Sequence, residues 1–135
     1  MMDRTQKLLS IRPLIASAKI MPEMSDAERF QNQTLRPIIK LQNDLLLVSF
    51  RNYIKKMKNT FYELTLEKRM DYITKAIQKD VKLRNSLKGM IIGQLTVEEY
   101  EIYIQNSSAL NKRMMNMVIK RIEDQIQYFD KYELV

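Results

Sequence analysis

Cysteine and histidine are both absent from the 135-residue sequence. Without cysteine no disulfide can form, which fits a protein of a reducing compartment. Without imidazole, the ligand sets of zinc hydrolases, facial-triad iron oxygenases and histidine-containing di-iron bundles cannot be built. The acidic residues at 98, 99 and 101 stand at the start of a predicted helix, where the helix dipole and a capping box account for them. We therefore expect no metal, no cofactor, no catalytic residue and no enzymatic activity.

Glycine, proline and long apolar runs are also scarce. Two glycines and three prolines are too few for the many tight turns of a β-sandwich or barrel, which favours an all-α fold. The longest stretch without a charged residue has ten residues, half of what a spanning helix needs. Near the N-terminus, Arg12 and Pro13 interrupt the apolar run that a secretory signal requires. The expectation is a cytoplasmic protein with no membrane span.

Apolar side chains recur at intervals of three and four residues along most of the chain, which predicts a bundle of about five helices. Four of the helix starts carry a typical capping residue, namely Ser25, Thr65, Asp80 and Thr96. Pro37 falls inside the first helix and predicts a kink or break near residues 35–36, because proline lacks an amide hydrogen. The predicted helices cover residues 26–58, 66–78, 81–94, 97–105 and 109–128.

The positions of the prolines and the extent of the helical periodicity predict three segments. Residues 1–24 contain two prolines and no sustained helical period, so they form an N-terminal arm that is either irregular or docked on the domain. Residues 25–129 form a single helical domain. Residues 130–135 form a C-terminal tail that frays.

The first and last long helices are apolar over a wide arc. In the first, Ile38, Leu41 and Leu45 form one stripe, while Ile39 and Leu46 begin another. A helix of this kind is either covered on two sides within the domain or shares part of its surface with a second subunit. The leading hypothesis is therefore a non-catalytic interaction or scaffold protein that self-associates as a homodimer, with another protein as a further partner.

Positive charge suggests an alternative partner. The formal net charge is +7, divided into +9 over residues 1–95 and −2 over residues 96–135. A nucleic-acid-associated regulator could use the basic face of residues 51–88, because lysine and arginine side chains neutralise phosphates. The predicted helices 66–78 and 81–94 have the lengths of a helix-turn-helix pair. The candidate phosphate contacts are Lys79, Lys82, Arg84 and Lys88.

A third hypothesis concerns the polar run around Pro37. Backbone groups freed by the proline, together with nearby amides, could form a site for a small molecule or a partner, and such a site could also be that of an enzyme. The candidate residues are Asn32, Arg36, Gln42 and Asn43. The alternative is that these amides only satisfy the broken helical turn.

Three segments carry a family resemblance: RFQNQTLRPIIKLQN at 29–43, QKD at 78–80 and SSALNKR at 107–113. Over residues 26–128 the sequence resembles a small family of uncharacterised bacterial all-helical proteins, some of which are called glyoxalases. Glyoxalases of the first type combine a βαβββ fold with a metal held by histidine and glutamate or glutamine, and those of the other type are histidine-rich binuclear metallohydrolases. Because this sequence has no histidine, the resemblance implies a helical fold but transfers no glyoxalase site residue.

Overall fold

Helices make up all the regular structure of the described chain. The computed structural model describes residues 2–15 and 20–132, and within these ranges it contains eight α-helices and no strand. The predicted all-α class is confirmed, whereas the predicted number of about five helices is wrong. The α-helices are α1 (Arg4–Ile11), α2 (Asp26–Phe30), α3 (Arg36–Leu41), α4 (Asn43–Lys56), α5 (Leu66–Lys79), α6 (Val81–Ile92), α7 (Val97–Ile104) and α8 (Ser107–Asp124).

The four predicted capping residues begin helices as expected. Ser25, Thr65 and Thr96 each accept a hydrogen bond from the backbone amide three residues further on, and Asp80 accepts one from the amide of Leu83 at 3.1 Å. At Thr96 the box is complete, because the carboxylate of Glu99 accepts from the Thr96 amide at 2.9 Å. Local hydrogen bonding therefore fixes the starts of α2, α5, α6 and α7.

The helix predicted over residues 26–58 is divided into several elements, which accounts for part of the error in the helix count. Between α2 and α3 lies a π-helix, Gln31–Leu35, in which the amide of Arg36 donates to the carbonyl of Gln31 five residues back. Its wider turn gives room beside the ring of Pro37, which has no amide to donate. Of the predicted kink or break near residues 35–36, the break does not occur, because the chain stays helical there and the irregularity is the widened turn just before Arg36.

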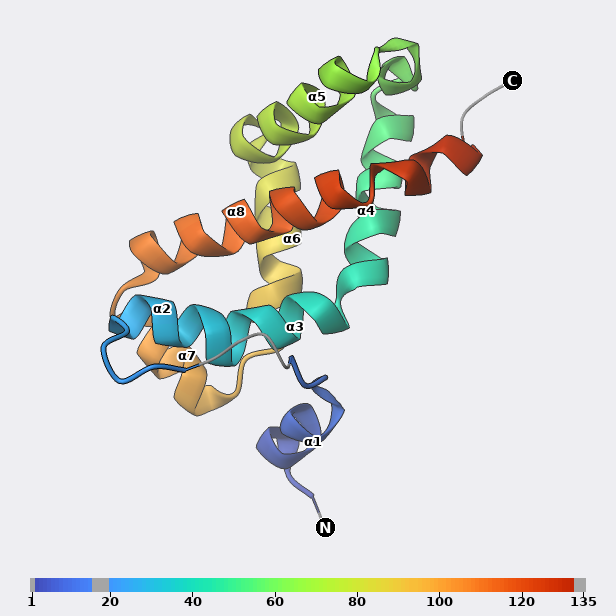
Figure 1. The fold of residues 1–135 in the computed structure, drawn as a ribbon. Helices are drawn as coiled ribbons and strands as arrows, with labels where there is room; N and C mark the ends of the chain where they lie inside the picture. Colours follow the sequence, from blue (N-terminus) through green and yellow to red (C-terminus); the bar gives the residue numbers. More distant parts are fainter. Residues whose placement is uncertain (1, 16–19, 133–135) are drawn as a thin grey trace.

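The chain changes direction instead at Gln42, where the backbone leaves helical geometry at φ −87° and ψ 4°. Figure 1 shows α4 departing at a wide angle from the line of α2 and α3. The side chain of Gln42 donates from Nε2 to the carbonyl of Met90 in α6 at 2.8 Å. The corner is thus fastened to a distant element of the fold.

The N-terminal arm, for which the sequence left an irregular and a docked form open, contains a helix in its described part and contacts the domain. Asp3 and Gln6 form a complete capping box, with both hydrogen bonds at 2.9 Å, and α1 follows from it. No residue of α1 is buried, and the segment is held by Arg12, which donates to both carboxylate oxygens of Glu99 at 2.5 and 2.6 Å. Residues 1 and 16–19 of the predicted arm lie outside the described residues.

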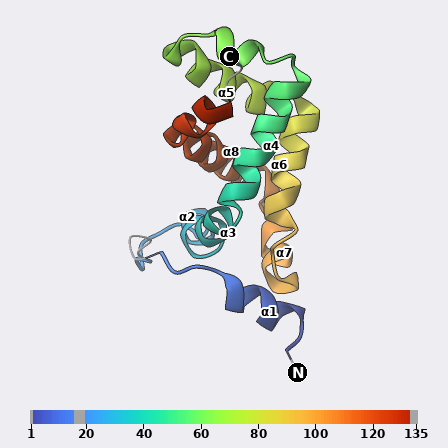
Figure 2. The ribbon, with the colours of Figure 1, turned by 90° about the vertical axis from the view of Figure 1, so that its right-hand side faces the viewer.

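Helix α8 is the central element of the packing. It crosses α6, with α5 on one side and α2 and α3 on the other (Figure 1). The view in Figure 2 places α8 and α2–α3 on the same side of the molecule, with α1 at the end beyond α7. The core side of α8 consists of Leu110, Met114, Met115, Val118, Ile119 and Ile122.

Three fully buried aromatic rings pack together at the end of the domain that lies away from α1. Phe50 of α4, Phe61 of the 3-10 helix Thr60–Glu63 and Phe129 of the 3-10 helix Ile126–Tyr132 lie with centroids 5.6–6.4 Å apart and edges facing rings. This arrangement is the favourable one for aromatic pairs. Residues 130–132 of the predicted tail therefore belong to a helix anchored by Phe129, while residues 133–135 lie outside the described residues.

Within residues 2–15 and 20–132, no helix is both long and apolar enough to cross a membrane.

The aromatic cluster gives a stability prediction. Phe50→Ala should lower the free energy of unfolding by about 3–5 kcal/mol, because it removes buried area and leaves a cavity. Leu45 lies on the same helix with 47% of its surface exposed, so Leu45→Ala should change stability by less than about 1 kcal/mol. Urea denaturation followed by circular dichroism measures both. Equal losses in the two variants would contradict the described core.

Candidate anion-binding site

The four residues proposed around Pro37 do not form one cluster. Gln42 points to α6, as described above, whereas the Oδ1 atom of Asn32 accepts a hydrogen bond from Nε of Arg36 at 2.8 Å. Asn43 pairs with the amide of Gln125 beyond α8, donating at 3.1 Å and accepting at 2.5 Å. Asn32, Arg36 and Asn43 thus border the interface of α3 with α8, and Gln42 does not.

A groove of about 780 Å³ lies between this region and α8. Its lining comes from the π-helix, α3, α8 and Ile15 of the N-terminal segment. Cationic side chains dominate, since a single carboxylate, that of Asp124, is present among the described lining residues. The cations are Arg36, Lys40, Arg113, Lys120 and Arg121.

Amide side chains, which carry no charge, hold the three arginines of this groove. Besides the Asn32–Arg36 contact, Arg113 donates to Oε1 of Gln31 at 2.7 Å, and Arg121 donates to Oδ1 of Asn43 at 3.2 Å. Within the described part of the chain, none of the three forms an ion pair with a carboxylate. An amide oxygen orients a guanidinium without neutralising it, so the full positive charge remains available to an anion.

A second groove, of about 400 Å³, lies on the other side of α8, against α6 and the end of α5. Arg84 and Lys88 of α6 and Lys112 of α8 line it, and its described lining includes no carboxylate. Two of the four residues proposed as phosphate contacts, Arg84 and Lys88, therefore lie in a groove. The other two, Lys79 and Lys82, are exposed but are not among the described lining residues of either groove.

The outward face of α8 separates the two grooves. Every fourth residue from Ser108 to Asp124 is exposed, and these residues form a stripe that winds slowly around the helix. Ser108 and Lys112 line the second groove, whereas Lys120 and Asp124 line the first. Asn116 lines both grooves. Together the two linings hold eight cations and one carboxylate, a net charge as large as the +7 of the whole chain.

The sequence reasoning missed the contribution of α8, because the segment 96–135 has a net charge of −2. A signal was present, however. No acidic residue occurs between Glu101 and Glu123, while that interval contains Lys112, Arg113, Lys120 and Arg121, and the outward stripe follows from a four-residue spacing.

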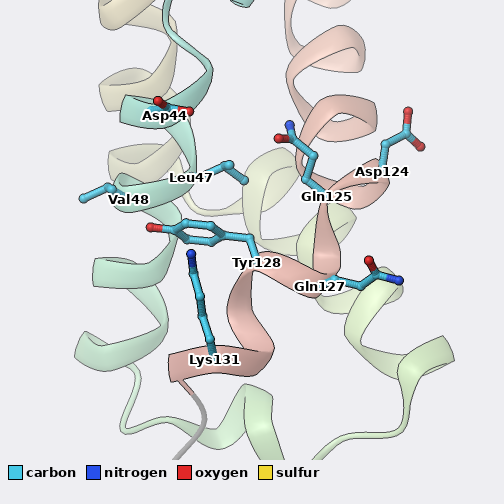
Figure 3. A pocket seen from close by; sticks show the side chains of 8 residues that line it. All are labelled: Asp44, Leu47, Val48, Asp124, Gln125, Gln127, Tyr128 and Lys131. Carbon is cyan, nitrogen blue, oxygen red and sulfur yellow. The ribbon is translucent and has the colours of Figure 1, made fainter.

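A third hollow, of about 610 Å³, lies between α4 and the 3-10 helix that follows α8 (Figure 3). Asp44 and Asp124 come from opposite walls, and Lys131 approaches the ring of Tyr128, with Nζ 4.9 Å from the centroid. This hollow lacks the single sign of charge that distinguishes the other two. Among residues 2–15 and 20–132, no three carboxylates gather in a group that could hold a metal ion.

Glu99, one of the acidic residues considered for a metal site, is fully engaged by other groups. Its carboxylate accepts from Arg12, from the Thr96 amide and, at 3.3 Å, from the hydroxyl of Thr34. Burial alone would raise its pKa, but the hydrogen bonds from Arg12 and Thr96 and the charge of Arg12 outweigh this effect and lower the pKa. The pair fastens the N-terminal segment to α7.

No family model matches the sequence, and neither a curated protein nor a solved structure gives a match. The resemblance to the family of bacterial helical proteins therefore stays a prediction, and the site must be interpreted from its own geometry.

The lowered pKa of Glu99 generates a pH prediction. An unfolded glutamate titrates near pH 4.3, and in the folded protein protonation occurs at lower pH, so the stabilisation is complete above about pH 5 and is lost as the pH falls through the folded pKa. Thermal melting from pH 6 to pH 3 should show a steeper loss in the parent protein than in Glu99→Gln. Glu98→Gln, an exposed neighbour, should keep the parent profile. If Glu99→Gln also keeps it, the ion pair does not contribute to stability.

Proposed function

We propose that this protein is a non-catalytic nucleic-acid-binding protein that contacts its partner through the two grooves on either side of α8. The observation that carries the proposal is the concentration of eight cations and one carboxylate along these grooves. Neutralisation of phosphates by lysine and arginine releases counterions and supplies most of the affinity of non-specific nucleic-acid binding. A surface with one sign of charge over two adjoining grooves is the footprint that such a partner requires.

The distribution of the cations favours an extended anion over a small one. Arg113 and Arg121 are eight residues apart on α8, which separates their backbone positions by about 12 Å along the helix axis. Further cations stand across each groove, on α3 and on α6. A chain of phosphates matches this spread better than a single phosphate group does.

The chemistry of the linings supports binding without catalysis. Their polar groups are amides, cations, one carboxylate and the hydroxyl of Ser108. A hydroxyl nucleophile needs a neighbouring base, and histidine, the commonest one, is absent from the chain. This proposal keeps the non-catalytic character of the leading sequence hypothesis and takes the partner from the alternative. It moves the basic face from residues 51–88 to α8, α3 and part of α6.

The proposal predicts a loss of affinity when charge is reversed in the grooves. Arg113→Glu combined with Arg121→Glu should weaken binding to labelled duplex and single-stranded DNA at least 10-fold. The slope of log affinity against log salt, measured by fluorescence anisotropy between about 50 and 200 mM salt, is negative, and its magnitude should decrease by roughly 0.9 for each lost duplex phosphate contact.

The matched control reverses two exposed cations of the originally predicted face, Lys55 and Lys56, which are not among the described lining residues of either groove. Lys55→Glu with Lys56→Glu should retain most of the affinity. No binding of the parent protein to any nucleic acid at about 50 mM salt would remove the proposal.

Self-association is a second proposal, supported by the exposed apolar face of α7. Val97, Tyr100 and Ile104 follow one another at intervals of three and four residues, with 61%, 46% and 54% of their surfaces exposed. Apolar side chains gathered on one helix face are typical of a contact surface. Light scattering at micromolar concentration should give a dimer, and Ile104→Glu should give a monomer with unchanged helical content. A monomeric parent protein would contradict this proposal.

A further inference from the structure

We infer that the partner is duplex DNA and that α8 enters its major groove, with the cations that stand across the two grooves, on α3 and α6, on the phosphates of either strand. This inference rests on the proposed function and adds the form of the nucleic acid and the role of each part of the surface.

The shape of the surface is the first argument. Helix α8 has a groove along each side, and Figures 1 and 2 show it crossing α6 on the side of the molecule where α2 and α3 also lie. An α-helix with its side chains is about 10–12 Å across, and the major groove of B-DNA is about 12 Å wide. A helix with a hollow along each side suits a duplex, because the helix lies in the major groove and the hollows receive the two backbones.

The second argument is the chemistry of the exposed stripe. Ser108, Lys112, Asn116 and Lys120 follow one another at about 6 Å along the helix and present hydroxyl, ammonium and amide groups outward. Asparagine forms a bidentate pair with the edge of adenine, and lysine donates to the acceptors of guanine. The part of the stripe that can contact DNA ends before Asp124, because the carboxylate of Asp124 repels phosphate. This carboxylate is paired with Lys120 at 3.5 Å.

The flanking cations have a different role. Arg36 and Lys40 of α3 stand across one groove, and Arg84 and Lys88 of α6 stand across the other. Contacts of such residues with phosphates fix the position of a protein on the duplex but carry no sequence information. Separate substitutions can therefore test positioning and readout.

Other forms of nucleic acid fit this surface less well than duplex DNA does. Single-stranded binding requires aromatic rings on which bases stack, and the described lining of the two grooves contains none. The rings of Phe50, Phe61 and Phe129 are fully buried at the other end of the domain. A-form RNA is disfavoured as well, since its major groove is too deep and narrow for side chains to read.

The test begins with selection of a preferred sequence from a random duplex library by the parent protein. Anisotropy then compares this duplex with a scrambled duplex, the same sequence as duplex RNA, the single strand and heparin. The parent should bind the selected DNA duplex most tightly. Asn116→Ala should reduce the ratio of selected to scrambled affinity roughly 5- to 150-fold while leaving affinity for the scrambled duplex within about 2-fold.

Two further variants separate the roles. Arg36→Ala should weaken binding to both duplexes equally. It should also decrease the magnitude of the slope of log affinity against log salt by about 0.9. Asn85→Ala, at an exposed position of α6 that is not among the described lining residues, is the matched control and should change neither quantity. Circular dichroism of each variant checks that the exposed substitutions leave the fold intact.

The remaining outcomes distinguish failure of the major-groove inference from failure of the proposed nucleic-acid binding. No binding to any of the five probes overturns both. Equal binding to all of them, tighter binding to single strands or RNA, or no effect of Asn116→Ala on the ratio overturns the inference alone, because the basic surface would still bind a polyanion. Preference for duplex DNA, together with a preference for the selected over the scrambled duplex that Asn116→Ala abolishes, supports α8 in the major groove.

Discussion

The burial of one side of α8 is the constraint on which the rest of the structure depends. Leu110, Met114, Val118 and Ile122, spaced four residues apart, are at most 2% exposed, and they fix the rotation of the helix about its axis. Once that rotation is set, the residues at 108, 112, 116 and 120 must face outward. Those at 113 and 121 must face α3. The position of every proposed contact on α8 therefore follows from hydrophobic packing that involves none of them.

The placement of α3 beside α8 depends on two unusual features of the backbone. The π-turn at Gln31–Leu35 lets the helix continue past Pro37, and the corner at Gln42 then directs α4 into the core. Arg36 and Lys40, one helical turn apart on α3, consequently face the same groove. Widened helical turns occur frequently at functional sites, and here the turn also contributes Gln31, whose amide holds Arg113.

Local signals in the sequence predicted the helical class and the capped starts of four helices, because these depend on neighbouring residues. The corner at Gln42 could not be predicted in this way, since its side chain is bound by the carbonyl of Met90, 48 residues later. The capping box of Asp3 and Gln6, by contrast, is a local signal in the sequence that the prediction of the N-terminal arm did not use, and for this reason α1 was not predicted. Two of the four predicted phosphate contacts, Arg84 and Lys88, line a groove. Helical spacing predicts the direction in which these side chains point, but it does not predict which helix lies opposite them.

Net charge summed over a segment of sequence is a poor guide to the field at a surface. The segment 96–135 is acidic in total, but three of its acids have specific partners: Glu99 is bound by Arg12, Glu123 accepts from Thr74 at 2.5 Å, and Asp124 is paired with Lys120. The arginines of α8 are instead oriented by amides and keep their charge. A carboxylate beside each arginine would have held it equally well and cancelled the attraction for an anion. The choice of neutral partners is what makes this surface suited to binding.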